Sequence, residues 1–327
     1  MRTRSFLALV LATGLVPLSM AALAQGAWPN QPIRMVVPYP AGGGTDFFAR
    51  LIAPGMGEAL GQTVLVENRP GASGIIGATA VAKQFPADGY TFLLGDMTTY
   101  AINPSMFEKL SYDPLKDLAP VTMTAKFDFL LVVNPQVLPV HNVKELVAAA
   151  AAAPTGLNYG SPSNGTTHHL ATELLARDTG AKLVAITYKG GGPAVQDLVA
   201  GHIGLMFLDR ATARPHIESG KLRAIAAAGA TRVAAYPDVP TVAEQGLKGF
   251  QVEGWQGFTV RTGTPEPIVK ALAAAYAKVI TSPEIRRKLG EAGIDPVAGT
   301  PEQFTAYMQS ETARWQAVIR ERGIKPD

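Results

Sequence analysis

The sequence predicts an α/β protein with two lobes and a cleft between them. Short apolar runs alternate with amphipathic segments, a pattern typical of sheets covered by helices. Glycine-containing loops at 42–44, 160–165 and 190–192 each join an apolar run to a helix. After residue 240 the alternation stops, and one strand leads into a series of helices. A chain that fills one lobe, crosses to a second and then returns would produce this order.

The first series begins with the apolar run Ile33–Val37, whose composition is that of a buried strand. Thr45 is the expected N-cap of the next helix, because its hydroxyl can accept from first-turn N–H groups. Further strands are expected at 63–66 and 91–94, with a helix at 73–85 between them. Since strand and helix alternate, the sheet is expected to be parallel. The segment 96–122 lacks periodicity and is expected to be irregular.

The second series and the return segment are divided by turns rich in Gly and Pro. In the second series, strands are expected at 129–133, 157–159 and 183–187, and helices at 143–153, 166–179 and 194–200. The segments 203–207, 216–219 and 222–227 continue the alternation. The return segment is expected to hold a strand at 255–260 and helices at 265–280, 283–292 and 301–322.

The N-terminus has the features of an export signal. Two arginines precede the apolar segment 6–23, and the A-L-A sequence at 22–24 is a small-residue cleavage site before Gln25. A membrane anchor is the alternative, because the segment is nearly long enough to span a bilayer. Pro17 and the cleavage site favour removal. The mature chain is therefore expected to start near Gln25 and to be soluble in the periplasm or outside the cell.

Composition excludes several classes of protein. The 327-residue chain has a formal charge of +3, and two of its basic residues lie in the expected signal segment. No basic run is interleaved with aromatic residues, so no nucleic-acid partner is expected. The chain contains no cysteine, which rules out disulfides, thiolate zinc sites and a lipid-modified N-terminal cysteine.

The glycine loop at 42–44 has two interpretations. It lacks the nucleotide-binding patterns G-x-x-x-x-G-K-[ST] and G-x-G-x-x-G, so a simple tight turn is one of them. The other is an anion site, because such a junction presents unpaired N–H groups and the positive end of a helix dipole. Similar junctions at 160–167 and 190–194 favour the anion site. A side chain at Gly43 is then expected to strain a left-handed turn or displace the N–H groups.

Other polar residues carry weaker signals. Asp46, in the first helical turn, either caps its own helix or receives an amino group or a water. His168 and His169 are adjacent, so a helix would point them about 100° apart and they could not clamp one metal ion. The segment 161–165 is not a G-x-S-x-G nucleophile elbow, because Ser161 occupies the position of the first glycine. Neither a catalytic nor a metal site is expected.

A series of short motifs runs over nearly the whole mature chain. In order they are W-P at 28–29, P-I-R at 32–34, V-V-P-Y-P at 36–40, L-G-Q at 60–62, V-E-N-R-P-G-A at 66–72, P-A-D-G-Y at 86–90, A-I-N-P at 101–104, Y-D-P at 112–114, Y-K-G at 188–190, G-K-L-R-A at 220–224 and P-D-V-P-T at 237–241. With these motifs the chain resembles the Bug-type periplasmic solute receptors of tripartite tricarboxylate transporters. The resemblance implies a two-lobed, type II periplasmic-binding-protein architecture that closes by hinge motion around a small ligand.

The resemblance also implies lobe boundaries and a binding site. Lobe 1 would comprise 25–125 and 250–327, lobe 2 would comprise 126–249, and 1–24 would be the signal peptide. The hinge strands would lie near 127–133 and 255–260. A ligand carboxylate would bind the loops 39–46 and 160–167, with His169 and Leu170 completing the second motif. The expected ligand-binding residues are Tyr39, Ala41, Gly43, Gly44, Thr45, Asp46, Ser161, Asn164, Gly165, Thr166, Thr167, Tyr188, Asp209 and Arg210.

Two positions depart from the family pattern. Ser163 stands where glycine is usual, and Arg210 stands where similar receptors often carry a small or polar residue. The distal, specificity-setting end of the pocket is therefore left open. If Arg210 enters the cleft, it should pair with a second anionic group of the ligand.

The implied function is capture of a small organic carboxylate and its delivery to the membrane subunits of a tripartite tricarboxylate transporter. No cofactor is expected, and the protein is expected to be a monomer. Two alternatives are a ligand-binding sensor that docks on a signalling partner and a secreted α/β hydrolase with a remote Ser/His/Asp set. Dicarboxylates, aromatic acids, amino acids and nicotinate-like acids are all compatible with the sequence.

Overall fold

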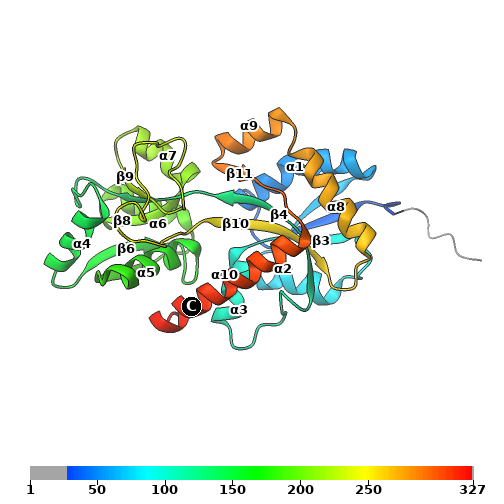
Figure 1. Cartoon of the computed structure of the whole chain (residues 1–327), viewed down its shortest axis with the longest axis horizontal. Helices are drawn as coiled ribbons and strands as arrows, with labels where there is room; N and C mark the ends of the chain where they lie inside the picture. Colours follow the sequence, from blue (N-terminus) through cyan, green and yellow to red (C-terminus); the bar gives the residue numbers. More distant parts are fainter. Residues whose placement is uncertain (1–27, 326–327) are drawn as a thin grey trace, which may run out of the picture.

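A computed structural model describes residues 28–325 of the chain. Figure 1 shows two lobes side by side, each with its own sheet and helices, joined by long strands that run between them. The expected cleavage site before Gln25 lies outside the described residues. Among the residues described, no helix is both long and apolar enough to cross a bilayer.

The first lobe contains a sheet with the strand order β11-β4-β10-β3-β1-β2. Its members are β1 (Ile33–Val37), β2 (Val64–Asn68), β3 (Thr91–Asp96), β4 (Leu118–Phe127), β10 (Gly254–Arg261) and β11 (Ile294–Pro296). Strand β1 runs parallel to β2 and β3, whereas β10 is antiparallel to both β3 and β4, and β11 is antiparallel to β4. The prediction of a parallel sheet is therefore correct only for β1, β2 and β3, which come first in the chain. The strands that leave for the second lobe and return from it reverse direction.

The second lobe repeats this arrangement with the order β7-β6-β8-β5-β9. Its members are β5 (Phe129–Val133), β6 (Leu157–Ser161), β7 (Leu183–Thr187), β8 (Leu205–Asp209) and β9 (Arg223–Ala227). Strand β6 is parallel to β7 and β8, and β5 is antiparallel to β8 and β9. In both lobes the antiparallel strands adjoin the crossing between lobes.

Helices cover both faces of each sheet. They are α1 (Gly44–Leu60), α2 (Ile75–Thr79), α3 (Asn103–Met106), α4 (Val143–Ala152), α5 (Thr167–Thr179), α6 (Gly191–Ala200), α7 (Arg210–Glu218), α8 (Glu266–Val279), α9 (Pro283–Glu291) and α10 (Pro301–Arg322). One face of the first sheet packs on α1, α8 and α9, and the other on α10. In the second lobe, α6 and α7 cover one face, and α4 and α5 the other.

Two segments differ from their sequence prediction. The expected helix 73–85 is a succession of short pieces, namely η1 (Ala72–Gly74), α2 and the π-helical turn η2 (Ala80–Gln84). The expected irregular segment 96–122 contains a second π-helical turn, η3 (Thr98–Ile102), then α3 and the start of β4. Each of these pieces is about one helical turn long, which is too short to leave a periodic pattern in the sequence.

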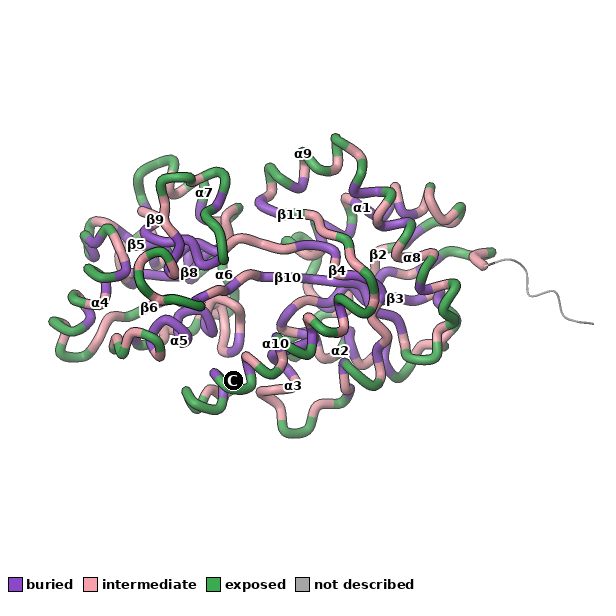
Figure 2. Tube along the Cα trace, in the orientation of Figure 1, coloured by how far each residue is buried: buried purple, intermediate pink, exposed green. Residues whose placement is uncertain are grey.

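The C-terminal helix braces the crossing between the lobes, of which strand β10 is the buried part. Strands β4 and β5 are separated only by Asp128, and Figure 2 shows β10 buried where it runs between the lobes. Glu311 of α10 accepts hydrogen bonds from the indole nitrogens of Trp255 in β10 (3.3 Å) and Trp315 (3.0 Å). Near the end of α10, Arg322 forms an ion pair of 2.7 Å with a carboxylate of α5. The helix therefore contacts both lobes as well as the strand that joins them.

Candidate functional site

The first junction, the loop between β1 and α1, leaves the start of its helix open. Gly43 is the N-cap of α1 and has no side chain to bond the first-turn N–H groups. Thr45, the N-cap expected from sequence, is instead the second residue of the helix. The reason is that Gly43 has an extended backbone (φ −82°, ψ 171°), and its carbonyl already accepts from the amide of Phe47 at 2.8 Å. Ala41 and Gly44 are exposed beside it.

The left-handed residue of this loop is Gly42. Its φ is +84°, whereas Gly43 has an ordinary φ of −82°. A side-chain carbon at Gly43 would have only the carbonyl oxygen of Pro40 within 4 Å, at 3.7 Å. The expectation that a side chain at Gly43 would strain a left-handed turn is therefore wrong. The remaining reason for a glycine at position 43 is that a side chain there would take up the space of a bound group.

The side chain of Asp46 bonds the loop of the first junction to α1 and to the end of β2. Its buried carboxylate accepts from the backbone N–H of Gly42, from Nε of Arg50 and from Nδ2 of Asn68, each at 2.9 Å. The hydrogen bond from Arg50, followed by those from Gly42 and Asn68, outweighs desolvation and lowers the pKa of Asp46 to about 2. Asp46 therefore bonds the loop, Arg50 and Asn68 rather than a first-turn N–H group of α1, and each oxygen of its carboxylate already has a protein donor.

Tyr39 is held over the carboxyl end of β3. Its hydroxyl donates a short hydrogen bond to Asp96 and lies 3.2 Å from Oγ1 of Thr99. Asp96 also accepts from the amide of Thr99 at 3.1 Å. Burial raises the pKa of the Asp96 carboxyl and that of Tyr39. This cluster fixes the exit of β1 relative to β3, at the sheet edge where the glycine loop begins.

The second junction, the loop between β6 and α5, satisfies its own polar groups. Thr166 is the N-cap of α5, and its hydroxyl accepts from the amide of His169 at 3.4 Å and donates to the carbonyl of Ser163 at 3.0 Å. The buried Ser161 hydroxyl donates to the same carbonyl at 2.7 Å. The amide of Gly165 donates to Nδ1 of His169 at 3.0 Å. Thr167 begins the helix, and Asn164 lies partly buried in the loop.

The second junction also touches the first lobe. Gly165 has a φ of +72°, and a side-chain carbon there would lie 2.2 Å from Sδ of Met106 and 3.6 Å from Cγ2 of Ile102. Both of those residues belong to the η3–α3 segment of the first lobe. The lobes therefore meet directly at this glycine, and its missing side chain allows the approach.

Two further residues expected at the site have partners within the protein. The hydroxyl of Tyr188 donates to Asp197 at 2.8 Å. Burial is the main cause that raises the pKa of Tyr188 to about 12. Asp209 caps α7 by accepting from the amide of Thr212 at 2.9 Å. These contacts occupy the polar group of Tyr188 and one oxygen of Asp209.

Arg210 lies between the lobes. Its Nε is 3.6 Å from Asp128 at the crossing, and its Nη2 is 3.8 Å from Asp295 of β11 in the first lobe. The side chain lines a hollow of about 450 Å³ between α7 and α9, which face each other in Figure 1. Arg210 therefore connects three segments that meet where the lobes adjoin, and a ligand anion there would have to compete with two carboxylates.

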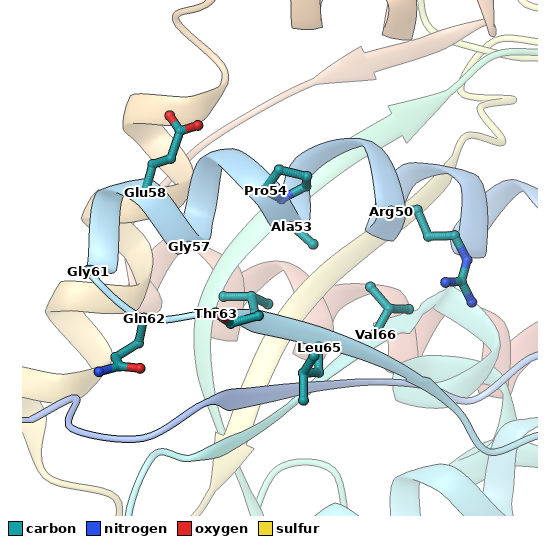
Figure 3. Close-up of a pocket in the computed structure, with 11 residues that line it drawn as sticks. Arg50, Ala53, Pro54, Gly57, Glu58, Gly61, Gln62, Thr63, Leu65 and Val66 are labelled. Atoms are coloured by element: carbon teal, nitrogen blue, oxygen red, sulfur yellow. The ribbon is translucent and has the colours of Figure 1, made fainter.

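Another hollow, of about 940 Å³, lies on the outer edge of the first lobe (Figure 3). It runs between α1 and the edge strand β2, lined by Arg50, Ala53, Pro54, Gly57, Glu58, Gly61, Gln62, Thr63, Val64, Leu65 and Val66. It contains no residue of either junction and no residue of the second lobe. Closure of the lobes would not enclose it, so it does not meet the geometry expected of the ligand site.

Sequence reasoning missed two polar residues at the crossing. They are Asp96 at the end of β3 and Gln256 near the start of β10. Gln256 could have been noticed, because it is a polar residue inside an otherwise apolar run, W-Q-G-F-T-V at 255–260. Asp96 carried no comparable signal. Within residues 28–325, no group of three or more His, Cys, Asp or Glu residues is placed to hold a metal ion.

Two α/β lobes, joined by crossing strands and each presenting a strand–loop–helix junction, define a protein of the periplasmic-binding-protein architecture. The chain belongs to the tripartite tricarboxylate transporter family of receptors, whose family pattern matches residues 48–324. The predictions of a two-lobed fold and of the family are therefore confirmed. Because this is a receptor family, the chain is a solute receptor, and the hydrolase alternative is set aside.

Several relatives support this assignment. The protein BugT of Bordetella pertussis is 37% identical over 306 residues, covering 93% of each chain. A solved Rhodopseudomonas palustris protein, Rpa4515 with adipate, is 37% identical with a TM-score of 0.81, covering 92% of this chain and 100% of that one. MatC of the same species, solved with bound malate, is 33% identical with a TM-score of 0.77, covering 89% and 100%. Since the family consists of periplasmic receptors, the protein is assigned to the periplasm.

Proposed function

We propose that this receptor binds a small organic carboxylate between its lobes, with the carboxylate against the first turn of α1. The observation that carries the proposal is the open start of that helix, where Gly43 offers no cap and the neighbouring loop is exposed. Helix N-termini stabilise anions through free N–H groups and the helix dipole. Solved relatives with adipate and with malate support the same class of ligand.

A site of this kind can reach micromolar affinity without an arginine. A hydrogen bond to a charged group contributes about 1.5–3 kcal/mol, and a helix end adds about 0.3–1 kcal/mol. Micromolar affinity requires about 8 kcal/mol. Four or five such bonds in a closed cleft sum to about 6–15 kcal/mol. The upper part of that range covers the requirement and a share of the cost of association. We assign most of these bonds to the exposed first junction, because the second junction uses several of its polar groups internally.

The ligand is then delivered to the membrane subunits of a tripartite tricarboxylate transporter. We propose that the mature receptor is a monomer that starts near Gln25, with lobe 1 formed by 25–125 and 250–327 and lobe 2 by 126–249. Mass spectrometry of the secreted protein would test the start. Retention of residues 6–23 with membrane association would contradict it.

Binding is tested by identifying the small molecule that copurifies under native conditions and then titrating it by calorimetry. We expect one carboxylate per chain and no turnover of the bound compound. Small-angle scattering should show a smaller radius of gyration at saturation, because hinge closure brings the lobes together. Failure of every carboxylate in a broad panel to bind would contradict the proposal, as would chemical conversion of the ligand.

A further inference from the structure

Gln256 is a buried polar residue without a protein partner. It lies in β10 with none of its surface exposed, and neither Nε2 nor Oε1 of its side chain has a hydrogen-bond partner within the described part of the chain. Buried side-chain amides are normally bonded, because leaving them unbonded is costly. An unpaired amide at a buried crossing therefore suggests a group that is supplied from outside the chain.

The position of Gln256 places its side chain at the edge where the ligand loops begin. Side chains alternate along a strand, so Gln256 shares a face with Phe258, which packs in the core beneath α1 and α8. Its Cα partner in β3 is Asp96, the residue that holds the hydroxyl of Tyr39. Strand β10 runs opposite to β3, so Gln256 lies at the carboxyl edge of β1 and β3.

A second unpaired polar atom approaches the same crossing from the other lobe. Nδ1 of His168, in the first turn of α5, is buried and has no hydrogen-bond partner among the described residues. Its ring packs edge-on against Phe129, with 5.1 Å between ring centroids. Phe129 in turn borders Gly254, where a side-chain carbon would lie 2.9 Å from its ring. Gly254 is two residues from Gln256 in β10, so Phe129 contacts both the ring of His168 and the start of the strand that carries Gln256.

The chemistry of these groups restricts what can satisfy them. A glutamine amide is neutral and presents both a donor and an acceptor. A carboxylate would bond Nε2 but would leave Oε1 unpaired, because an ionised carboxylate only accepts. A hydroxyl both donates and accepts, so it can satisfy either amide atom. His168 is also neutral, because burial lowers the pKa of its imidazole.

We propose that Gln256 is a specificity-determining residue that hydrogen-bonds a hydroxyl group of the ligand, so that the receptor prefers hydroxycarboxylates. The inference rests on the proposed function, since it assumes that a carboxylate occupies the cleft. It adds a second recognition point, on the crossing strand, that is distinct from the glycine loops. Sites built to bond a hydroxyl discriminate strongly against analogues that lack it.

The test compares pairs of acids that differ by one hydroxyl group, namely malate with succinate and 2-hydroxyadipate with adipate. Calorimetry on the parent should show at least tenfold tighter binding of the hydroxylated member in at least one pair. Gln256→Met keeps the side-chain length without polar atoms, and it should reduce that preference to less than threefold. Its Tm in the absence of ligand should equal or exceed that of the parent, because the variant removes an unpaired buried group.

Thr259→Val is the matched control on the same strand. Thr259 is also fully buried, but it faces the other side of the sheet and its hydroxyl lies 3.1 Å from that of Tyr100. This variant should lower the Tm and keep the hydroxyl preference. Absence of a preference in the parent, or its survival in Gln256→Met, would overturn the inference while carboxylate binding stands. If the parent binds no carboxylate, the proposed function fails together with the inference.

Discussion

Of the three strand–loop–helix junctions, those before α1 and α5 look alike in sequence but differ in how their first helical turn is satisfied. At the first junction, α1 starts from an uncapped glycine in an exposed loop. At the second, Thr166 caps α5, and the Ser161 hydroxyl and the Gly165 amide bond within the loop. The second junction is also packed against the first lobe at Met106. This difference is the reason why we propose the first junction as the anion site and the second as a support of the cleft.

This contrast shows that glycine-rich loops before helices differ in how they cap the first helical turn. What matters is whether N–H groups of the first turn remain available after local capping. A threonine hydroxyl at the N-cap accepts from one of these N–H groups, whereas a glycine leaves them without a side-chain acceptor. Variants that affect one property without the other can test the distinction.

The largest effect is expected at Gly165. Gly165→Val should lower the free energy of unfolding by about 3 kcal/mol, because left-handed strain of about 1–2 kcal/mol adds to overpacking of about 1–3 kcal/mol. Gly180→Val is the control, since Gly180 has a similar φ of +71° but no atom within 4 Å of the added carbon. Urea denaturation should show a clearly smaller loss for the control. Equal losses would mean that contact with Met106 is unimportant.

Asp46 should have the next largest effect. In Asp46→Asn the side-chain amide would face donors from Gly42, Arg50 and Asn68, so we expect a loss of about 2 kcal/mol near neutral pH. The pKa of Asp46 is lowered from 3.8 to about 2 in the folded state. Its contribution is therefore present above pH 3.8 and is lost as the pH falls through about 2.

The measurement for Asp46 is the free energy of unfolding of parent and variant between neutral pH and about pH 2, the folded-state pKa. The difference between them should shrink as the pH falls. A constant difference over this range would show that the charge of Asp46 does not stabilise the loop.

The neighbouring glycines should separate stability from binding. Gly42→Ala should destabilise the protein by about 1–2 kcal/mol, because alanine is strained at a φ of +84°. Gly43→Ala should change stability by less than about 0.5 kcal/mol, since its backbone is ordinary and its surroundings are open. Yet it should weaken ligand binding about tenfold, a change of about 1.4 kcal/mol, by occupying space beside the open helix start. Normal affinity in a folded Gly43→Ala variant would place the carboxylate elsewhere.

The smallest effect is expected at the cap of the second junction. Thr166→Val should cost about 1 kcal/mol of stability by removing the cap of α5. Thr300→Val removes the equivalent cap of α10, far along the chain from either junction, and should cost a similar amount. Only Thr166→Val should also reduce ligand affinity. If calorimetry gives the same affinity for both variants and the parent, the second junction contributes to folding alone.

Much of the fold could be predicted because its elements are long enough to show a pattern. The strands Ile33–Val37, Phe129–Val133 and Leu183–Thr187 agree with the prediction at both ends. Strand β11 was missed, because three residues at a sheet edge leave no detectable period. Most of β4 was also missed, since it alternates irregularly and carries Pro120 within it.

The site could be predicted only in outline. The loops around Gly43 and Thr166 are recognisable from glycine and capping residues before a helix. The internal partners of Asp46 could not be foreseen, because Asn68 is 22 residues away in the chain and meets it only through the pairing of β1 with β2. The unpaired amide of Gln256 is likewise invisible without the burial that the surrounding strands impose.

The sequence by itself determined the alternation of strands and helices, the glycine junctions and the family, because periodicity, turn chemistry and motifs are local properties. Only the tertiary structure decided which helix start remains open, which glycine is left-handed and which polar groups lack partners. Those properties depend on contacts between residues far apart in the chain. Met106 against Gly165 and Asp96 beside Gln256 are examples, since each pair meets only after the chain has crossed between the lobes.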